Sequence, residues 1–192
     1  GTAWHVLITR GFLQAGQTVL IQAAGSGIGS AAVQVAKLAG AGAIITTASS
    51  EKKLEHARAL GATHLINYGK EDFVQKVMAI TGGRGVDVVM EHIGGEVFTK
   101  SLQCLARGGI IVTVGAHAGE VVEFDIIPFF RKELRLAGSK NASVLELRKV
   151  MGLVAEGKLK PIVHQAFPLS QAAEAHRVVG SRDFFGKVVL VP

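Results

Sequence analysis

A glycine-rich turn, Ala24–Gly29 (AGSGIG), follows an apolar run and opens an amphipathic stretch. Small residues suit a tight turn whose backbone approaches a diphosphate, and the helix that follows offers unpaired N–H groups and a partial positive charge. In the G-x-G-x-x-G frame that ends at Gly29, Ala24 and Ser26 replace the first two glycines, so the pattern alone is weak. Because the turn lies between a predicted strand and a predicted helix, we infer that it binds a dinucleotide. The expected diphosphate-binding residues are Ser26, Gly27, Ile28 and Gly29.

Hydroxyl and lysine side chains follow the second predicted strand. An NAD site expects Asp or Glu about 20 residues after the turn, to bind the ribose hydroxyls, but residues 44–50 contain no acid. Ser49, Ser50 and Lys53 stand there instead and can donate to a ribose 2′-phosphate. Each such bond to a charged group contributes about 1.5–3 kcal/mol. The pattern favours NADP(H) over NAD(H). The alternative is an ordinary helix start, with Ser50 as the N-cap and Lys52 and Lys53 in solvent.

Short apolar runs rich in β-branched residues alternate along the chain with apolar stripes at helical spacing. Glycines close these stripes, and the chain holds 24 of them against about 13 at average usage. Repeated turns between strands and helices use glycine in this way. The predicted strands are Thr18–Ala23, Ala43–Thr47, His64–Asn67, Val86–Met90, Ile110–Val114 and Leu134–Ala137.

Strands that are apolar throughout are typical of parallel sheets buried on both faces. The alternation predicts an α/β fold with a doubly wound, six-stranded parallel sheet of the Rossmann type. The end of the chain differs, because Pro161–Phe167 and Lys187–Val191 look extended around a helix at Ser170–Val179. We therefore predict an NAD(P)-binding domain over residues 1–158. Residues 159–192 form a return segment that packs on this domain or on a further one.

Composition excludes several classes of protein. The net charge of +6 is scattered, without a run of five basic residues or interleaved aromatic residues, so nucleic acid is not an expected partner. No apolar run approaches the ~18 residues of a membrane span, and no basic-then-apolar leader is present, so we expect a cytoplasmic protein without a membrane partner. The chain opens on Gly1 rather than Met, and we expect it to be part of a longer protein.

Few side chains suit acid–base or metal chemistry. His92 ends the fourth predicted strand, where it could relay a proton, line the pocket or cap the next helix. His117 follows the fifth strand, where it could approach a substrate or lie in solvent. With Cys104, the single cysteine, these residues lack the spacing of metal ligands. We assign no metal site and no catalytic residue to this chain.

Several stretches together resemble the medium-chain dehydrogenase/reductase superfamily, above all its zinc-type alcohol dehydrogenase and zeta-crystallin-like quinone oxidoreductase branches. The resemblance covers essentially the whole chain. It implies the cofactor-binding half of a two-domain enzyme whose other, GroES-like half holds the substrate pocket and any zinc. It also implies that the final strands belong to the fold of that half. The stretches are Gly1–His5, Val19–Lys37, Ala59–Tyr68, Thr81–Val89, Gly108–Gly115 and Gly186–Leu190.

The resemblance implies roles for single residues. Ser50 and Lys53 match the positions that hold a 2′-phosphate, and Tyr68 matches a tyrosine near the adenine nucleotide. Ile93 and the run Val114-Gly115-Ala116 match backbone that flanks the ribose and the nicotinamide.

The sixth strand takes two roles by resemblance. Leu136–Ser139, which includes Gly138 and Ser139, would close over the nicotinamide, and the edge Leu134–Ser139 would pair with a second copy to form a homodimer. The first functional hypothesis is hydride transfer between NADP(H) and a small quinone, enone or carbonyl. Two alternatives stay open: a zinc-dependent alcohol dehydrogenase using NAD(P), and a non-catalytic nucleotide-sensing protein.

Overall fold

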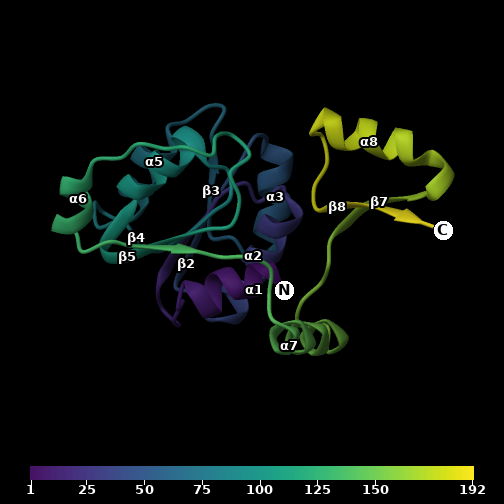
Figure 1. The fold of residues 1–192 in the computed structure, drawn as a ribbon, viewed down its shortest axis with the longest axis horizontal. Helices are drawn as coiled ribbons and strands as arrows, with labels where there is room; N and C mark the ends of the chain where they lie inside the picture. The colour runs from purple at the N-terminus through teal and green to yellow at the C-terminus, as the bar shows by residue number, and fades with distance from the viewer.

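The computed structural model describes residues 1–192 and confirms the doubly wound parallel sheet (Figure 1). All neighbouring strands in the main sheet run parallel, in the order β3-β2-β1-β4-β5-β6. The six strands are β1 Thr18–Ile21, β2 Ala43–Ala48, β3 His64–Asn67, β4 Val86–Glu91, β5 Leu105–Thr113 and β6 Arg135–Gly138.

The strand order reverses between β1 and β4. Val19 pairs with Ile44 of β2 on one side and with Val88 of β4 on the other, so the chain crosses over in opposite directions from this point. The carboxyl ends of all six strands lie at one edge, and an open α/β sheet binds ligands in the crevice at such a switch point.

Helices cover both faces of the sheet (Figure 1). One buried cluster joins the N-terminal helices and α2 to the sheet, and α7 packs against it; the other joins α4 and α5 to the opposite face. The helices are α1 Thr2–Trp4, the π-helix η1 His5–Arg10, α2 Gly27–Leu38, α3 Glu51–Leu60, α4 Phe73–Ile80, α5 Gly95–Gln103, α6 Ile126–Arg131 and α7 Val144–Ala155.

Several strand boundaries differ from the predicted ones: those of β2, β4 and β6 differ by one residue, and those of β1 and β5 differ by more. β1 ends at Ile21 instead of Ala23, because Ala23 adopts a φ of 51° and turns the chain toward α2. β5 begins at Leu105 instead of Ile110, because Leu105 already pairs with Val86 before the register shifts to Val88 and Ile110. The glycines at 108 and 109 therefore lie in an irregular part of a strand and do not end the preceding helix.

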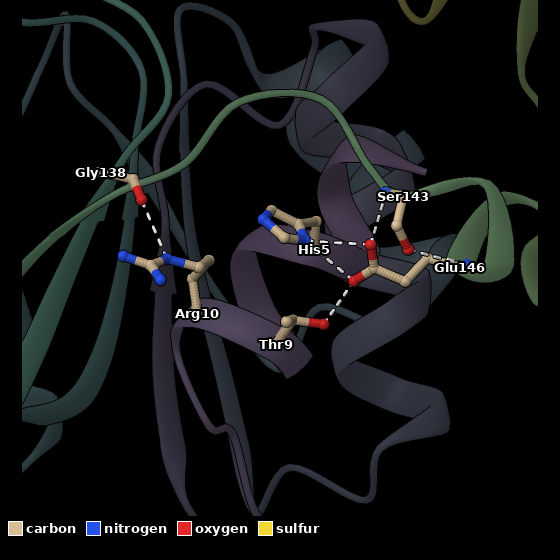
Figure 2. A network of polar contacts seen from close by, with 6 residues as sticks. All are labelled: His5, Thr9, Arg10, Gly138, Ser143 and Glu146. Carbon is tan, nitrogen blue, oxygen red and sulfur yellow. Dashed lines mark hydrogen bonds and ion pairs between the residues drawn. The ribbon is translucent and has the colours of Figure 1, made fainter.

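The N-terminal helices were not predicted from the sequence, and a polar network anchors them (Figure 2). Glu146 of α7 accepts hydrogen bonds from the hydroxyl of Thr9 and from Nδ1 of His5, the latter at 2.8 Å. It also accepts from the backbone N–H of Ser143, the N-cap of α7, at 2.7 Å. Arg10 donates from Nε to the carbonyl of Gly138 at 3.0 Å. The network joins η1 to the segment that connects β6 to α7.

The return segment builds a separate two-stranded parallel sheet, seen in yellow in Figure 1. Its members are β7 Val163–Pro168, the 3₁₀ turn η2 Leu169–Gln171, α8 Ala172–Ser181 and β8 Lys187–Val191. Many of its apolar side chains are exposed, among them Val163, Leu169 and Leu190. None of the helices in the chain is both long and apolar enough to span a bilayer.

Candidate functional site

The turn between β1 and α2 has the close approach that a diphosphate-binding turn requires. Ser26 is the N-cap of α2, and its Oγ accepts a hydrogen bond from the N–H of Gly29 at 2.9 Å. A Cβ at Gly29 would lie 2.3 Å from the carbonyl oxygen of Ala23, so only glycine fits there. Gly27 and Ile28 complete the first turn of the helix. All four expected residues therefore lie around one helix N-terminus, which favours a bound anion.

A lysine that the sequence analysis did not assign to the site lies against this turn. Gly186 donates from its N–H to the carbonyl of Gly25 at 2.9 Å, which carries the start of β8 to the turn. The stem of Lys187 then crosses Gly27 so closely that a Cβ there would lie 2.2 Å from Cε of the lysine. A cation therefore lies beside the positive end of α2. Only the folded chain joins residues this far apart in sequence.

The residues expected to bind a 2′-phosphate lie next to the turn. Nζ of Lys53 lies 3.4 Å from Oγ of Ser49 and also donates to the carbonyl of Arg182. Arg182 is a second basic residue that sequence reasoning missed, because it belongs to the distant return segment. A cavity of ≈ 410 Å³ is lined by Ala23, Gly25, Ser26, Ala48, Ser49, Lys53, Tyr68, Ser181, Arg182 and Phe184.

No acidic side chain lines this cavity. The nearest acid in the sequence, Glu51, accepts hydrogen bonds from Asn67 Nδ2 at 2.8 Å and Lys70 Nζ at 3.0 Å, on the side of β3. These partners lower the pKa of Glu51, the hydrogen bond from Asn67 most strongly. Ser50 is not among the lining residues; its Oγ caps α3 by accepting from the N–H of Lys53 at 3.4 Å, as in the helix-start alternative.

A second cavity adjoins the first through Tyr68 and Ala23. It measures ≈ 310 Å³ and lies between the ends of β1, β2, β3 and β4 and the start of α5. Phe73, Val97 and Ile93 give it apolar walls that suit a flat base. The sequence-predicted Tyr68 and Ile93 are thus brought together, whereas Val114–Ala116 and Gly138–Ser139 lie farther along the same edge, at the ends of β5 and β6.

Two titratable residues lie at the carboxyl end of β4: Glu91 is its last residue and His92 follows it. The Glu91 carboxylate is fully buried and accepts from the N–H groups of Ile93 and Gly94 at 2.5 and 2.9 Å, while burial raises its pKa. Glu91, not His92, therefore binds the start of the following segment. His92 is 6% exposed, and burial lowers its pKa to about 4, so its imidazole is neutral at physiological pH. His117 is exposed in the loop after β5.

No group of three or more His, Cys, Asp or Glu side chains in the chain is arranged to hold a metal ion. Cys104 is buried, and burial raises its pKa to about 12, which makes it unreactive as a thiolate.

Comparisons with known proteins agree with the fold and the turn. Residues 27–156 match the family model described as zinc-binding dehydrogenase. The chain is 36% identical to a 2-haloacrylate reductase from Burkholderia sp, over all of this chain and 60% of the relative. It is 35% identical to a quinone oxidoreductase-like protein 2 homolog from Nematostella vectensis, over 99% of this chain and 54% of that protein.

Among solved structures, an NAD-dependent alcohol dehydrogenase superposes with a TM-score of 0.92 at 42% identity, over all of this chain and 56% of its own. The chain thus spans little more than half the length of the relatives that it matches. The matched residues begin at Gly27, inside the turn, and include all of α2, β2 to β6 and α7. The chain therefore belongs to the zinc-binding dehydrogenase family of the medium-chain dehydrogenase/reductase superfamily.

Proposed function

We propose that this chain is the NADP(H)-binding part of an oxidoreductase that transfers hydride between the nicotinamide and a small quinone, enone or carbonyl compound. Relatives named 2-haloacrylate reductase and quinone oxidoreductase-like protein support this class of reaction. The observation that carries the choice of cofactor is the acid-free cavity at the end of β2, with Lys53 and Arg182 on its wall.

The charge of the cavity favours NADP(H). A carboxylate in this cavity would bind the ribose hydroxyls of NAD(H) and repel a 2′-phosphate, but Glu51 faces Asn67 and Lys70 instead. Lys53 and Ser49 are within reach of each other and can donate to a phosphate placed between them. The name of one structural relative, NAD-dependent alcohol dehydrogenase, favours NAD(H) as the second candidate.

The residues of this chain bind and orient the cofactor. The first turn of α2 and Lys187 stabilise the diphosphate, and the apolar cavity beside Ile93 encloses the adenine. Ile93 then lies on the adenine side of the cofactor, whereas the resemblance implies the nicotinamide side. The ends of β4, β5 and β6 then hold the nicotinamide side of the molecule. A bound nicotinamide supplies the hydride, while the protein positions it and excludes water.

The description of the family model implies zinc, and the residues of this chain do not fit a zinc site. Any zinc would be bound outside residues 1–192, as in the alternative of a zinc-dependent alcohol dehydrogenase. A non-catalytic nucleotide sensor is a further alternative, which predicts tight cofactor binding without turnover.

We also propose two assembly features. The edge of β6 pairs only with β5 and exposes Leu136, so residues 134–139 can pair with a second copy in a homodimer. Residues 159–192 belong with a further domain, because β7 and β8 leave Val163, Leu190 and Val191 exposed.

Two lysine variants test the cofactor assignment. We expect the protein to bind NADPH at least tenfold more tightly than NADH, and Lys53→Met to remove that preference by weakening NADPH alone, because one charge-assisted hydrogen bond is lost. Lys187→Met is the matched control and should weaken both cofactors equally, since both carry the diphosphate. Titration calorimetry measures each dissociation constant. Equal or tighter binding of NADH by the wild type would refute the assignment.

Activity is tested on the full-length protein with NADPH and a panel of quinones, enones and aldehydes. Turnover that survives a chelator supports the zinc-free reductase, and turnover lost with the metal supports the alcohol dehydrogenase. Tight NADPH binding without turnover of any substrate supports the sensor.

A further inference from the structure

Only two buried polar side-chain atoms in the protein lack a hydrogen-bond partner: Nδ1 of His92 and Oγ of Ser139. An unsatisfied buried polar group destabilises a folded protein, so each such atom in a native fold requires an explanation. A bound ligand is one explanation, provided that both atoms lie at a ligand-binding edge.

Both atoms do lie at the carboxyl edge of the sheet. Val114 donates from its N–H to Glu91 O at 3.0 Å, and Ser139 donates to Thr113 O at 2.9 Å. These bonds extend the β4–β5–β6 ladder by one row beyond Thr113, so His92, Val114 and Ser139 lie side by side. With strands about 4.8 Å apart, the row from His92 to Ser139 spans about 10 Å.

The side chain of His92 points to the diphosphate turn. Its Nε2 lies 3.4 Å from Oγ of Ser26, the N-cap of α2, so the ring is on the α2 face of the sheet at the switch point. A ligand whose diphosphate binds at α2 and which continues toward β6 passes this ring first. In a dinucleotide, the group next to the diphosphate on that side is a ribose.

We propose that Nδ1 of His92 hydrogen-bonds a hydroxyl of the ribose on the nicotinamide side of the bound dinucleotide. The inference rests on the proposed dinucleotide binding. A ribose hydroxyl both donates and accepts, so it satisfies Nδ1 in either tautomer of the neutral ring. His92 is thus a positioning residue that sets the nicotinamide relative to the end of β5.

The loop after β5 must shift for this contact to form. A Cβ at Gly115 would lie 2.8 Å from the carbonyl of His92, and the ring of His117 meets that of His92 edge-on at 6.4 Å between centroids. The tip, residues 116–118, is exposed, and the contact that its movement would break is the hydrogen bond from the N–H of Ala118 to the carbonyl of Ile93 at 2.6 Å.

Two conservative variants distinguish the role of Nδ1 of His92 from that of Nε2. An asparagine amide approximates Nδ1, and a glutamine amide approximates Nε2. We expect His92→Asn to bind NADPH within threefold of the wild type and His92→Gln to bind it about tenfold more weakly. Adenosine 2′,5′-bisphosphate, which lacks the second ribose, should bind both variants and the wild type equally.

The opposite result is wild-type affinity for NADPH in His92→Gln and weakened affinity in His92→Asn. It would show that His92 acts through the contact of its Nε2 with Ser26, and it would overturn the proposal. Equal affinities of all three proteins for NADPH, or a parallel loss for the bisphosphate, would overturn it too. If NADH proves the tighter ligand, the NADP(H) assignment fails and the same comparison is made with NADH and ADP.

If the variants fail to fold, a measurement on the wild-type protein tests the proposal instead. Nitrogen-15 spectra of the histidine rings should show a change at His92 Nδ1 on adding the dinucleotide, and none on adding the bisphosphate. A His92 signal that neither ligand moves would overturn the proposal.

Discussion

The close approach at Gly29 gives the most direct test of how the diphosphate turn is built. A methyl group at this position would lie 2.3 Å from the carbonyl oxygen of Ala23, about 1 Å inside ordinary van der Waals contact. The neighbour is backbone and cannot easily yield. Ala23 donates to Oγ1 of Thr47 at 3.0 Å and Ala24 to the Thr47 carbonyl at 2.9 Å.

Gly29→Ala should therefore destabilise the protein. Overpacking typically costs about 1–3 kcal/mol, the rigid neighbour puts this site at the upper end, and better helix propensity returns up to about 1 kcal/mol. The net loss of about 2 kcal/mol lowers Tm by roughly 4–8 °C in a domain of this size. Scanning calorimetry measures the shift.

Gly27→Ala, two residues earlier in the same turn, is the matched control. The three atoms nearest to its methyl group all belong to the flexible stem of Lys187, so Tm should stay within about 2 °C while the dinucleotide binds more weakly. A Gly29→Ala protein that melts with the wild type, or a Gly27→Ala protein that melts as low as Gly29→Ala, would contradict this account of the turn.

Two further predictions concern the N-terminal network and the sheet edge. The hydrogen bond from Thr9, with those from Ser143 and His5, lowers the pKa of Glu146 to about 2. Its stabilising contribution is full above the ordinary value of 4.5 and is lost as pH falls toward 2. Glu146→Gln should cost about 1–2 kcal/mol at pH 7, and denaturant titrations should show that the difference disappears near pH 2. Leu136→Lys should convert the proposed homodimer to monomers in sedimentation velocity, because it places charges at the paired β6 edges; a variant that sediments as the wild type would exclude this edge.

Much of the fold could be predicted from the sequence because local patterns carry it. Six parallel strands were predicted from apolar runs of strand length, from apolar residues at helical spacing and from the glycines that follow them. The turn Ala24–Gly29 predicted the helix N-terminus that the structure shows. The early start of β5 was not predicted, because Leu105 pairs with Val86 and no local pattern encodes this contact. The π-helix η1 was not predicted, because Glu146, which accepts a hydrogen bond from it, lies far along the chain.

The candidate site was likewise predicted in part from the sequence, and the rest of it depends on the tertiary structure. The residue types at the turn and after β2 were enough to expect a dinucleotide and to favour a 2′-phosphate. Only the tertiary structure turns Glu51 away from the cavity and sets His92 and Ser139 in one row. It also brings Arg182 to the cavity and Lys187 to the turn, both from the return segment. Periodicity and turn chemistry act between near neighbours, whereas the convergence of distant side chains depends on strand register and on how the return segment packs.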